Sequence, residues 1–156
     1  MSELVDDYRV TTMGLLFEAH IGLVGKLEPT WKRAGLSGLD LNALLRLSRS
    51  PGRRLRMNDL ATQIKLSTSG VTRLVDRLER GGLVVRESSR DDRRSTFAVL
   101  TPKGAERLDE VLPGYIAAIE RWFISLLDPG QLEALTAGLR IIRDATNPEA
   151  TARTPD

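Results

Sequence analysis

The sequence predicts a mainly α-helical fold that carries one small β-hairpin. Most of the chain spaces its apolar residues three and four positions apart, as one face of an α-helix does. Between residues 83 and 100 this spacing gives way to two short apolar or β-branched runs around a charged tip, which is typical of a hairpin. A length of 156 residues, 41% of them hydrophobic, suits one domain with its own core.

The first helices are bounded by proline and by a capping residue. We expect a long helix over residues 5–33 that Pro29 kinks near its end, because proline lacks the N–H that a helix interior uses. A short helix over 41–49 follows. Asp40 is expected to be its N-cap, since an aspartate side chain accepts a hydrogen bond from the first turn.

Two short helices and the hairpin complete the centre of the chain. Apolar spacing predicts helices over 57–65 and 68–80, the second capped by Ser67 or Thr68 and ended by Gly81-Gly82. The hairpin pairs residues 83–86 with 96–100. Helix, helix and two-stranded wing, in this order, make the layout of a winged helix-turn-helix, which we assign to residues 36–101.

Long helices flank this unit on both sides. Thr101-Pro102 begins a helix to about residue 127, and Pro113-Gly114 is expected to kink it. Asp128-Pro129 begins the last helix. The end helices, over 1–35 and 102–146, are too apolar to stand alone, so we expect them to pack on each other or on a second copy.

The end of the chain reads differently. Asn147-Pro148 closes the last helix, and residues 147–156 are expected to form a disordered tail.

The start of the chain lacks the basic segment of a signal or transit peptide, and the longest stretch without a charge is too short to cross a bilayer. We therefore expect a soluble, cytoplasmic protein without a membrane partner.

The charges are unevenly distributed. The whole chain has a formal net charge of +2, whereas residues 46–94 hold 13 Arg and Lys against 6 Asp and Glu. A basic centre between acidic flanks indicates a polyanionic partner that meets one part of the chain.

Several kinds of chemistry are excluded by composition. There is no cysteine and a single histidine, His20, so thiol switches, cysteine-ligated zinc and multi-histidine metal sites are ruled out. We find no glycine-rich phosphate loop and no recognisable pair of catalytic carboxylates. The sequence predicts neither an enzyme nor a bound cofactor or metal.

The helix over 68–80 is amphipathic, and its polar side carries the first candidate binding residues. A helix of this width enters a B-DNA major groove with its N-terminal residues at the base edges. Ser69, Thr72 and Arg73 lie near that end, while Arg77 and Arg80 are better placed for phosphates. The alternative is an ordinary solvated face.

The hairpin tip carries the second group of candidates. Arginines are concentrated there among three carboxylates, and arginine is favoured in a narrow minor groove because of the negative potential. Asp92 can orient Arg94 by a paired contact. The alternative is a solvated charge run on a loop. The arginines of this stretch are Arg86, Arg90, Arg93 and Arg94.

The chain resembles the MarR family of bacterial transcriptional regulators. The resemblance covers roughly residues 36–145 and rests on the order and spacing of several short motifs. These are Leu60-Ala61, the run from Val71 to Glu79, Gly82-Leu83-Val84, Asp92-Arg93-Arg94-Ser95 and Leu100-Thr101-Pro102-Lys103-Gly104.

The resemblance implies a homodimer that binds double-stranded DNA, with the end helices forming the dimer body. The DNA-reading roles of the family's recognition helix then fall on Ser67, Thr68, Ser69, Thr72, Arg73 and Arg77. The wing role falls on Asp92 and Arg94, with Arg90 and Arg93 beside them. One departure is Lys65, which stands in the turn where glycine is usual and is strained if that turn needs a positive φ.

The resemblance also implies a small aromatic or phenolic effector that lowers DNA affinity. His20 and Trp31 on the first helix and Arg46 and Arg49 on the next are candidates for such a pocket, and we assign none of them to it. The function predicted is a sequence-specific, ligand-responsive repressor on a pseudo-palindromic operator. The alternative is a winged-helix protein-interaction module without specific DNA binding.

Overall fold

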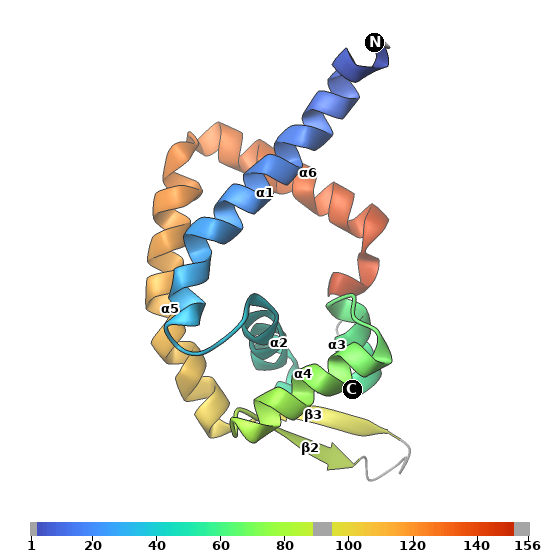
Figure 1. Cartoon of the computed structure of the whole chain (residues 1–156), viewed down its shortest axis with the longest axis vertical. Coiled ribbons are helices and arrows are strands. Elements are labelled where there is room, and N and C mark those ends of the chain that lie inside the picture. The colour runs from blue at the N-terminus through green and yellow to red at the C-terminus, as the bar shows by residue number, and fades with distance from the viewer. Residues whose placement is uncertain (1–2, 89–94, 152–156) are drawn as a thin grey trace.

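The structure is a computed structural model, and it describes residues 3–88 and 95–151 (Figure 1). Among them are six α-helices and one three-stranded sheet. In chain order the elements are α1 (Tyr8–Lys32), α2 (Gly38–Arg49), β1 (Arg54–Arg56), α3 (Met57–Gln63), α4 (Thr68–Arg80), β2 (Val84–Ser88), β3 (Thr96–Leu100), α5 (Pro102–Trp122) and α6 (Pro129–Thr146).

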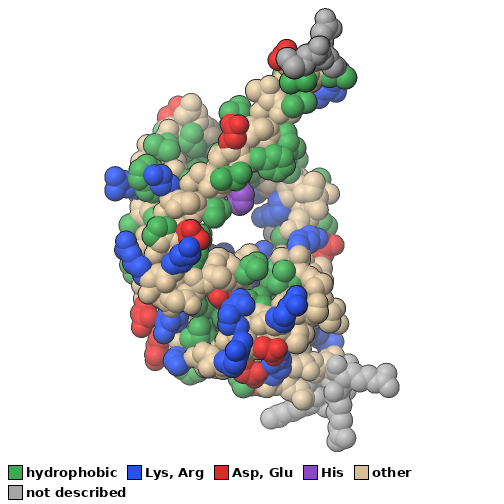
Figure 2. Space-filling view, viewed as in Figure 1, with side chains coloured by type: hydrophobic (Ala, Val, Ile, Leu, Met, Phe, Trp, Pro, Cys, Tyr) green, Lys and Arg blue, Asp and Glu red, His purple; other side chains and the backbone are tan. Residues whose placement is uncertain are grey.

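These elements form a head and an arch. The head consists of α2, α3, α4 and the sheet, which gather at one end of the molecule (Figure 1). The arch consists of α1, α5 and α6. α1 packs along α5, and α6 turns back so that the short 3₁₀ helix after it, η4 (Pro148–Thr151), contacts α3. Head and arch thereby close a ring, and the space-filling view shows an opening through it (Figure 2).

The sheet contains one strand more than the sequence predicted. Its order is β1-β3-β2, and both pairings are antiparallel. β1 has only three residues, and its central Leu55 is buried opposite Ala98 of β3. The two strands of the predicted hairpin are confirmed in place, with β2 starting at Val84 and extending to Ser88.

The hydrophobic core lies in the head and at the foot of α1 and α5. The apolar side of α4 is buried against α2, α3 and β2, as its periodicity predicted. Trp31, near the end of α1, is 7% exposed and stacks edge-to-face with Tyr115 of α5. Burial of these aromatic and branched side chains drives the helices together. The buried residues of α4 are Val71, Leu74, Val75 and Leu78.

Helix starts follow the predicted capping residues in three of four cases. Ser67, Thr101 and Asp128 accept hydrogen bonds from the third residue of α4, α5 and α6. Asp40 is not the N-cap of α2, which starts earlier, at Gly38. Ser37 is the cap, and Asp40 occupies the third helical position, where it completes a capping box.

Several boundaries differ from the prediction. α1 starts at Tyr8 because Asp7 caps it, and the helix continues past Pro29 to Lys32. α5 also continues past its proline, but it ends at Trp122 instead of residue 127. A disordered tail from residue 147 is wrong for its first part, because Pro148–Thr151 form η4. Residues 152–156 lie outside the described residues.

Two of the quoted motifs meet at the base of α5. Thr101 donates a hydrogen bond from Oγ1 to the carbonyl of Gly82 at 2.7 Å, and its N–H donates to that of Leu83 at 3.1 Å. A Cβ on Gly104 would lie 2.1 Å from the Leu83 carbonyl oxygen. The glycine is therefore required by close packing of α5 on the start of the wing.

Candidate nucleic-acid interface

The polar side of α4 lies on the outside of the head. All six residues to which the DNA-reading role was assigned are exposed, and they follow one another along one face and the N-terminal end of the helix. The set consists of Ser67, Thr68, Ser69, Thr72, Arg73 and Arg77.

The hydroxyl groups at the start of α4 are partly used by the helix itself. Ser67 Oγ accepts the N–H of Gly70 at 3.1 Å and lies 3.1 Å from Ser69 Oγ. Thr72 Oγ1 donates to the carbonyl of Thr68 at 2.8 Å. These contacts fix the hydroxyl groups at the helix end, which also presents free backbone N–H groups and the positive end of the helix dipole.

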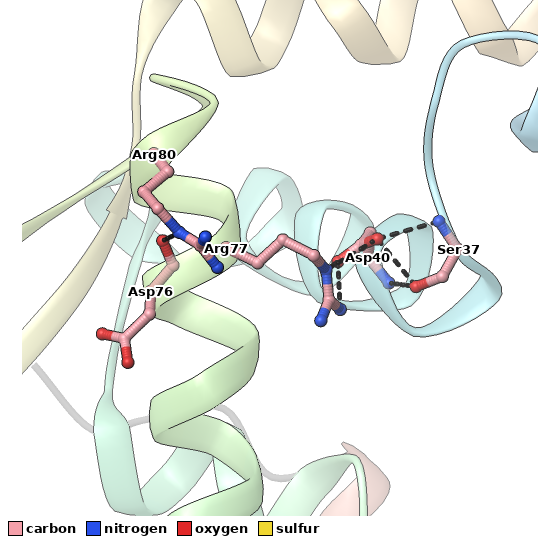
Figure 3. A network of polar contacts seen from close by, with 5 residues as sticks. All are labelled: Ser37, Asp40, Asp76, Arg77 and Arg80. Carbon is pink, nitrogen blue, oxygen red and sulfur yellow. Dashed lines mark hydrogen bonds and ion pairs between the residues drawn. The ribbon is translucent and has the colours of Figure 1, made fainter.

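The two arginines of the set differ in their surroundings. Arg73 is exposed and makes no hydrogen bond or ion pair with any described residue. Arg77 reaches back to α2, where its Nη2 and Nε lie 2.6 and 3.0 Å from Oδ1 of Asp40 (Figure 3). Arg73 is thus available to a partner, whereas Arg77 has one inside the molecule.

Asp40 links three parts of the head. Its side chain is 5% exposed, and its second oxygen, Oδ2, accepts both the N–H and the Oγ–H of Ser37, at 2.8 and 2.7 Å (Figure 3). A carboxylate this buried is stable only with such partners. The Asp40–Arg77 pair therefore ties α4 to the first turn of α2.

Arg86 on β2 ties α4 to the wing in the same manner. Its Nη1 lies 2.5 Å from Oε2 of Glu79, and its Nη2 lies 2.6 Å from Oδ1 of Asp76. Burial opposes the charged form, but these hydrogen bonds and charges outweigh it, so the pKa of Arg86 is raised. Two carboxylates on the recognition helix are neutralised in this way, which favours the approach of an anion.

The candidate residues of the wing tip, Arg90, Asp92, Arg93 and Arg94, lie outside the described residues. The ends of the wing are placed by Ser88 and Thr96, which pair at the last register position of β2 and β3. Arg86, which was grouped with the tip arginines, is instead engaged with α4.

The turn between α3 and α4 has the conformation that makes Lys65 unusual. Lys65 has a φ of 54°, in the left-handed region that glycine prefers. The N–H of Leu66 donates to the carbonyl of Ala61, and that of Lys65 donates to Thr62, which is the Schellman pattern. α3 ends at Gln63 for this reason, earlier than predicted. The Nζ of Lys65 lies 3.1 Å from Oε2 of Glu149 in η4.

The four residues considered for an effector pocket separate into different settings. Trp31 is part of the core, whereas His20 and Arg49 are exposed. Arg46 donates to three neutral oxygens, on Asn42, Gln63 and the backbone of Ala150. Its pKa is lowered, first by burial and then by the charge of Arg49. Arg46 is the one of the four whose charge is both partly buried and without a described carboxylate partner.

Sequence reasoning overlooked two features of this surface. Asp40 was interpreted as a cap, and its contact with Arg77 depends on residues 37 positions apart. The arginines of β1, Arg54 and Arg56, were counted in the basic centre but not singled out. The signal for them is their alternation with Leu55, which at three residues is too short to identify a strand until its pairing with β3 is known.

Two exclusions hold for the part of the chain that the structure describes. No helix there is long and apolar enough to cross a membrane. No group of three or more metal-ligating side chains is gathered at one point within 3–88 and 95–151.

Several solved structures share this fold, and AbsC and Sco3205 among them are MarR family transcriptional regulators. AbsC of Streptomyces coelicolor, a MarR family transcriptional regulator, is 37% identical with a TM-score of 0.82, over 89% of this chain and 94% of AbsC. Sco3205 of the same organism, in complex with DNA, is 34% identical with a TM-score of 0.81, over 86% of this chain and 85% of Sco3205. NadR in complex with 4-hydroxyphenylacetate is 25% identical with a TM-score of 0.67, over 81% and 88%.

Curated relatives match over a shorter part. The transcriptional repressor MprA of Escherichia coli K12 is 31% identical over 110 residues, which are 69% of this chain and 62% of MprA. The chain spans little more than half the length of the relatives that match with higher similarity.

The family model described as MarR family matches residues 34–95, which run from the end of α1 to the wing. That segment contains α4, the Asp40–Arg77 pair and the Arg86 contacts. Together with the likeness to AbsC over nearly the whole of both chains, this match shows that the chain belongs to the MarR family of winged helix-turn-helix transcriptional regulators.

Proposed function

We propose that the protein is a sequence-specific regulator that binds double-stranded DNA as a homodimer, with α4 in the major groove and the wing in the adjacent minor groove. The observation that carries the proposal is the exposed face of α4. Arg73 has no ion pair or hydrogen bond with any described residue, while Arg86 neutralises Asp76 and Glu79 of the same helix. Ser67, Thr68, Ser69 and Thr72 supply hydroxyl groups at the helix end that faces the bases.

The wing role is assigned to Arg90, Asp92, Arg93 and Arg94 on sequence alone. β2 and β3 lead outward from the head next to α4, and the assigned residues belong to the segment that joins these two strands (Figure 1). Arginines at such a tip suit the negative potential of a narrow minor groove. The structure of Sco3205 in complex with DNA supports DNA as the partner.

The apolar surface of the arch supports a homodimer. None of the residues of α6 is buried, and α1 buries only Trp31. Ile21 and Ile141 are 70% and 72% exposed. Exposed apolar side chains in such numbers indicate a surface that another protein buries. A second copy of the chain can bury it, because it presents the same two apolar helices. Two recognition helices in successive major grooves then require half-sites about 10 bp apart, in a pseudo-palindrome.

Repression relieved by a small aromatic effector is the mode of control we favour. MprA is a repressor, and NadR was solved with 4-hydroxyphenylacetate. In this chain Arg46 is a partly buried cation with neutral partners, which suits the carboxylate or phenolate of such a compound. An effector acts only if it and the operator favour different arrangements of the two heads.

The decisive experiment is capture of DNA from the fragmented genome of the source organism, washed at two salt concentrations and then sequenced. We expect a few sites that share an inverted repeat and survive the higher salt. Random fragments that disappear at higher salt would mean charge-driven adhesion only, and the interaction-module alternative would replace the regulator. Light scattering on the same preparation is expected to give twice the chain mass.

A further inference from the structure

A second group of arginines lies on β1, at the edge of the sheet away from β2. Arg53, Arg54 and Arg56 are all exposed, and Leu55 between them points into the core. In the antiparallel register Arg56 pairs with Phe97 and Arg54 with Val99 of β3. The two guanidinium groups therefore share the outer face of the sheet with the ring of Phe97.

Both side chains are held in place by that ring. The guanidinium carbon of Arg54 lies 4.8 Å from the ring centroid of Phe97, and that of Arg56 lies 5.6 Å from it. The stem of Arg54 also lies against Gly52, whose φ of 60° turns the chain into β1. Stacking fixes the planes of two guanidinium groups in advance, so less entropy is lost when they bind an anion.

The charge of this group is not neutralised within the described residues. Arg53 and Arg54 have no ion pair there, and Arg56 makes a single hydrogen bond, from Nη1 to Oγ of Ser95 at 3.3 Å. Glu87 lies across from Phe97 on β2, and it forms no ion pair with either arginine. Elsewhere on the head, by contrast, Arg77 and Arg86 are each held by carboxylates.

The group is continuous with the wing. Ser95 is the residue directly before β3, so its contact with Arg56 joins β1 to the base of the wing tip. Adjacent strands are about 4.8 Å apart, which brings β1 alongside the two strands that carry the tip. A duplex that receives the tip in its minor groove continues past this edge, and its phosphates are the anions that a stacked pair of arginines fits.

We propose that Arg54 and Arg56, stacked on Phe97, form a second phosphate-binding surface that holds DNA flanking the operator, outside the base pairs read by α4 and the wing. The inference rests on the proposed function, because it takes duplex DNA as the partner. With this second surface, the affinity for DNA depends on the length of the duplex and not only on the sequence of the inverted repeat.

The test compares two duplexes and two charge-matched variants. One duplex carries the captured inverted repeat with ten or so flanking base pairs on each side, and the other is trimmed to the repeat. The variant R54Q/R56Q removes two positive charges from the surface, and R33Q/R140Q removes two exposed charges from α1's end and α6. Circular dichroism and thermal melting establish that both variants fold. Light scattering establishes that both keep the oligomeric state of the wild type, because Arg140 lies on a helix of the proposed dimer surface.

Trimming the duplex is expected to lower the affinity of the wild type and of R33Q/R140Q on the order of tenfold. The affinity of R54Q/R56Q is expected to change hardly at all. On the long duplex R54Q/R56Q is expected to lose the same factor, and its salt slope is expected to fall by about 1.8, since each phosphate contact contributes about 0.9.

Two results would overturn the inference. One is binding of the long duplex by R54Q/R56Q that equals that of the wild type. The other is an equal loss on both duplexes, which would place the arginines within the operator contact itself. Wild-type protein that selects no repeat at all contradicts the proposed function, and this is seen before any variant is made.

Discussion

Arg77 and Asp40 stand 37 positions apart in the chain, and two nitrogens of the guanidinium bind the same carboxylate oxygen at 2.6 and 3.0 Å. The carboxylate is buried, whereas half of the arginine side chain is exposed. A residue assigned to DNA reading thus also fixes the recognition helix on α2. Within the head, this contact joins α4 directly to the first turn of α2.

The first prediction separates the two arginines of α4. Arg73→Ala is expected to weaken operator binding without a change in melting temperature, because Arg73 has no described partner. Arg77→Ala is expected to lower the free energy of unfolding by about 1–2 kcal/mol, because it leaves a buried carboxylate without its cation. Thermal melting and binding titrations on both variants give the comparison. Equal melting temperatures for the two would contradict the structural role of Arg77.

The second prediction concerns Arg86. Arg86→Ala is expected to weaken DNA binding even though this side chain faces α4, because Asp76 and Glu79 then present unpaired negative charge to the duplex. Adding Asp76→Asn and Glu79→Gln to Arg86→Ala is expected to restore much of the affinity. Binding titrations at a fixed salt concentration measure this. A triple variant that binds no better than Arg86→Ala would show that the contact only holds the wing.

The third prediction concerns Gly104 at the base of α5. Gly104→Ala is expected to destabilise the fold by about 3 kcal/mol, because the added methyl group overlaps the carbonyl of Leu83 and the backbone must move. Gly114 of the same helix is the control. A Cβ there meets nothing within 4 Å, and alanine is the better helix former, so Gly114→Ala is expected to leave the melting temperature unchanged or raise it.

The fourth prediction is a pH dependence of the contact between η4 and the head. The pKa of Glu149 is lowered, first by a hydrogen bond with its own backbone and then by Lys65. A lowered pKa in the folded state means that the contact is complete above the ordinary range of glutamate and is lost as pH falls through the lowered pKa. Carbon-detected NMR of the Glu149 carboxyl group is expected to show this. Lys65→Gln is expected to move its titration back towards the ordinary value, and an unchanged titration would exclude the ion pair.

The parts that the sequence predicted correctly are those determined by neighbours in the chain. Ser67, Thr101 and Asp128 cap their helices through contacts three residues ahead, so the local pattern contains all that is needed. The apolar stripe of α4 and the hairpin follow from periodicity in the same way. The family pattern also marked Lys65 as strained if its turn needs a positive φ, and the φ there is 54°.

The parts that were missed depend on distant residues or on very short elements. β1 has three residues, too few for alternation to be recognised, and it exists because β3 pairs with it. Ser37 and Asp40 both suit an N-cap; Ser37 takes this position, and Asp40 at the third helical position completes the capping box and accepts from the distant Arg77. η4 follows a helix-ending Asn-Pro and was interpreted as tail. It is held by Lys65 and Arg46, which are far away in the sequence.

The attachment of η4 to α3 limits how the head moves. A domain attached at one point can rotate in any direction about that point, whereas a domain attached at two separate points rotates about the line that joins them. The head is fastened to the arch where α1 and α5 meet α2, and again where η4 meets α3. Rotation about the line that joins these two attachments is the movement that preserves both of them, whereas any other movement of the head has to break one of the two sets of contacts.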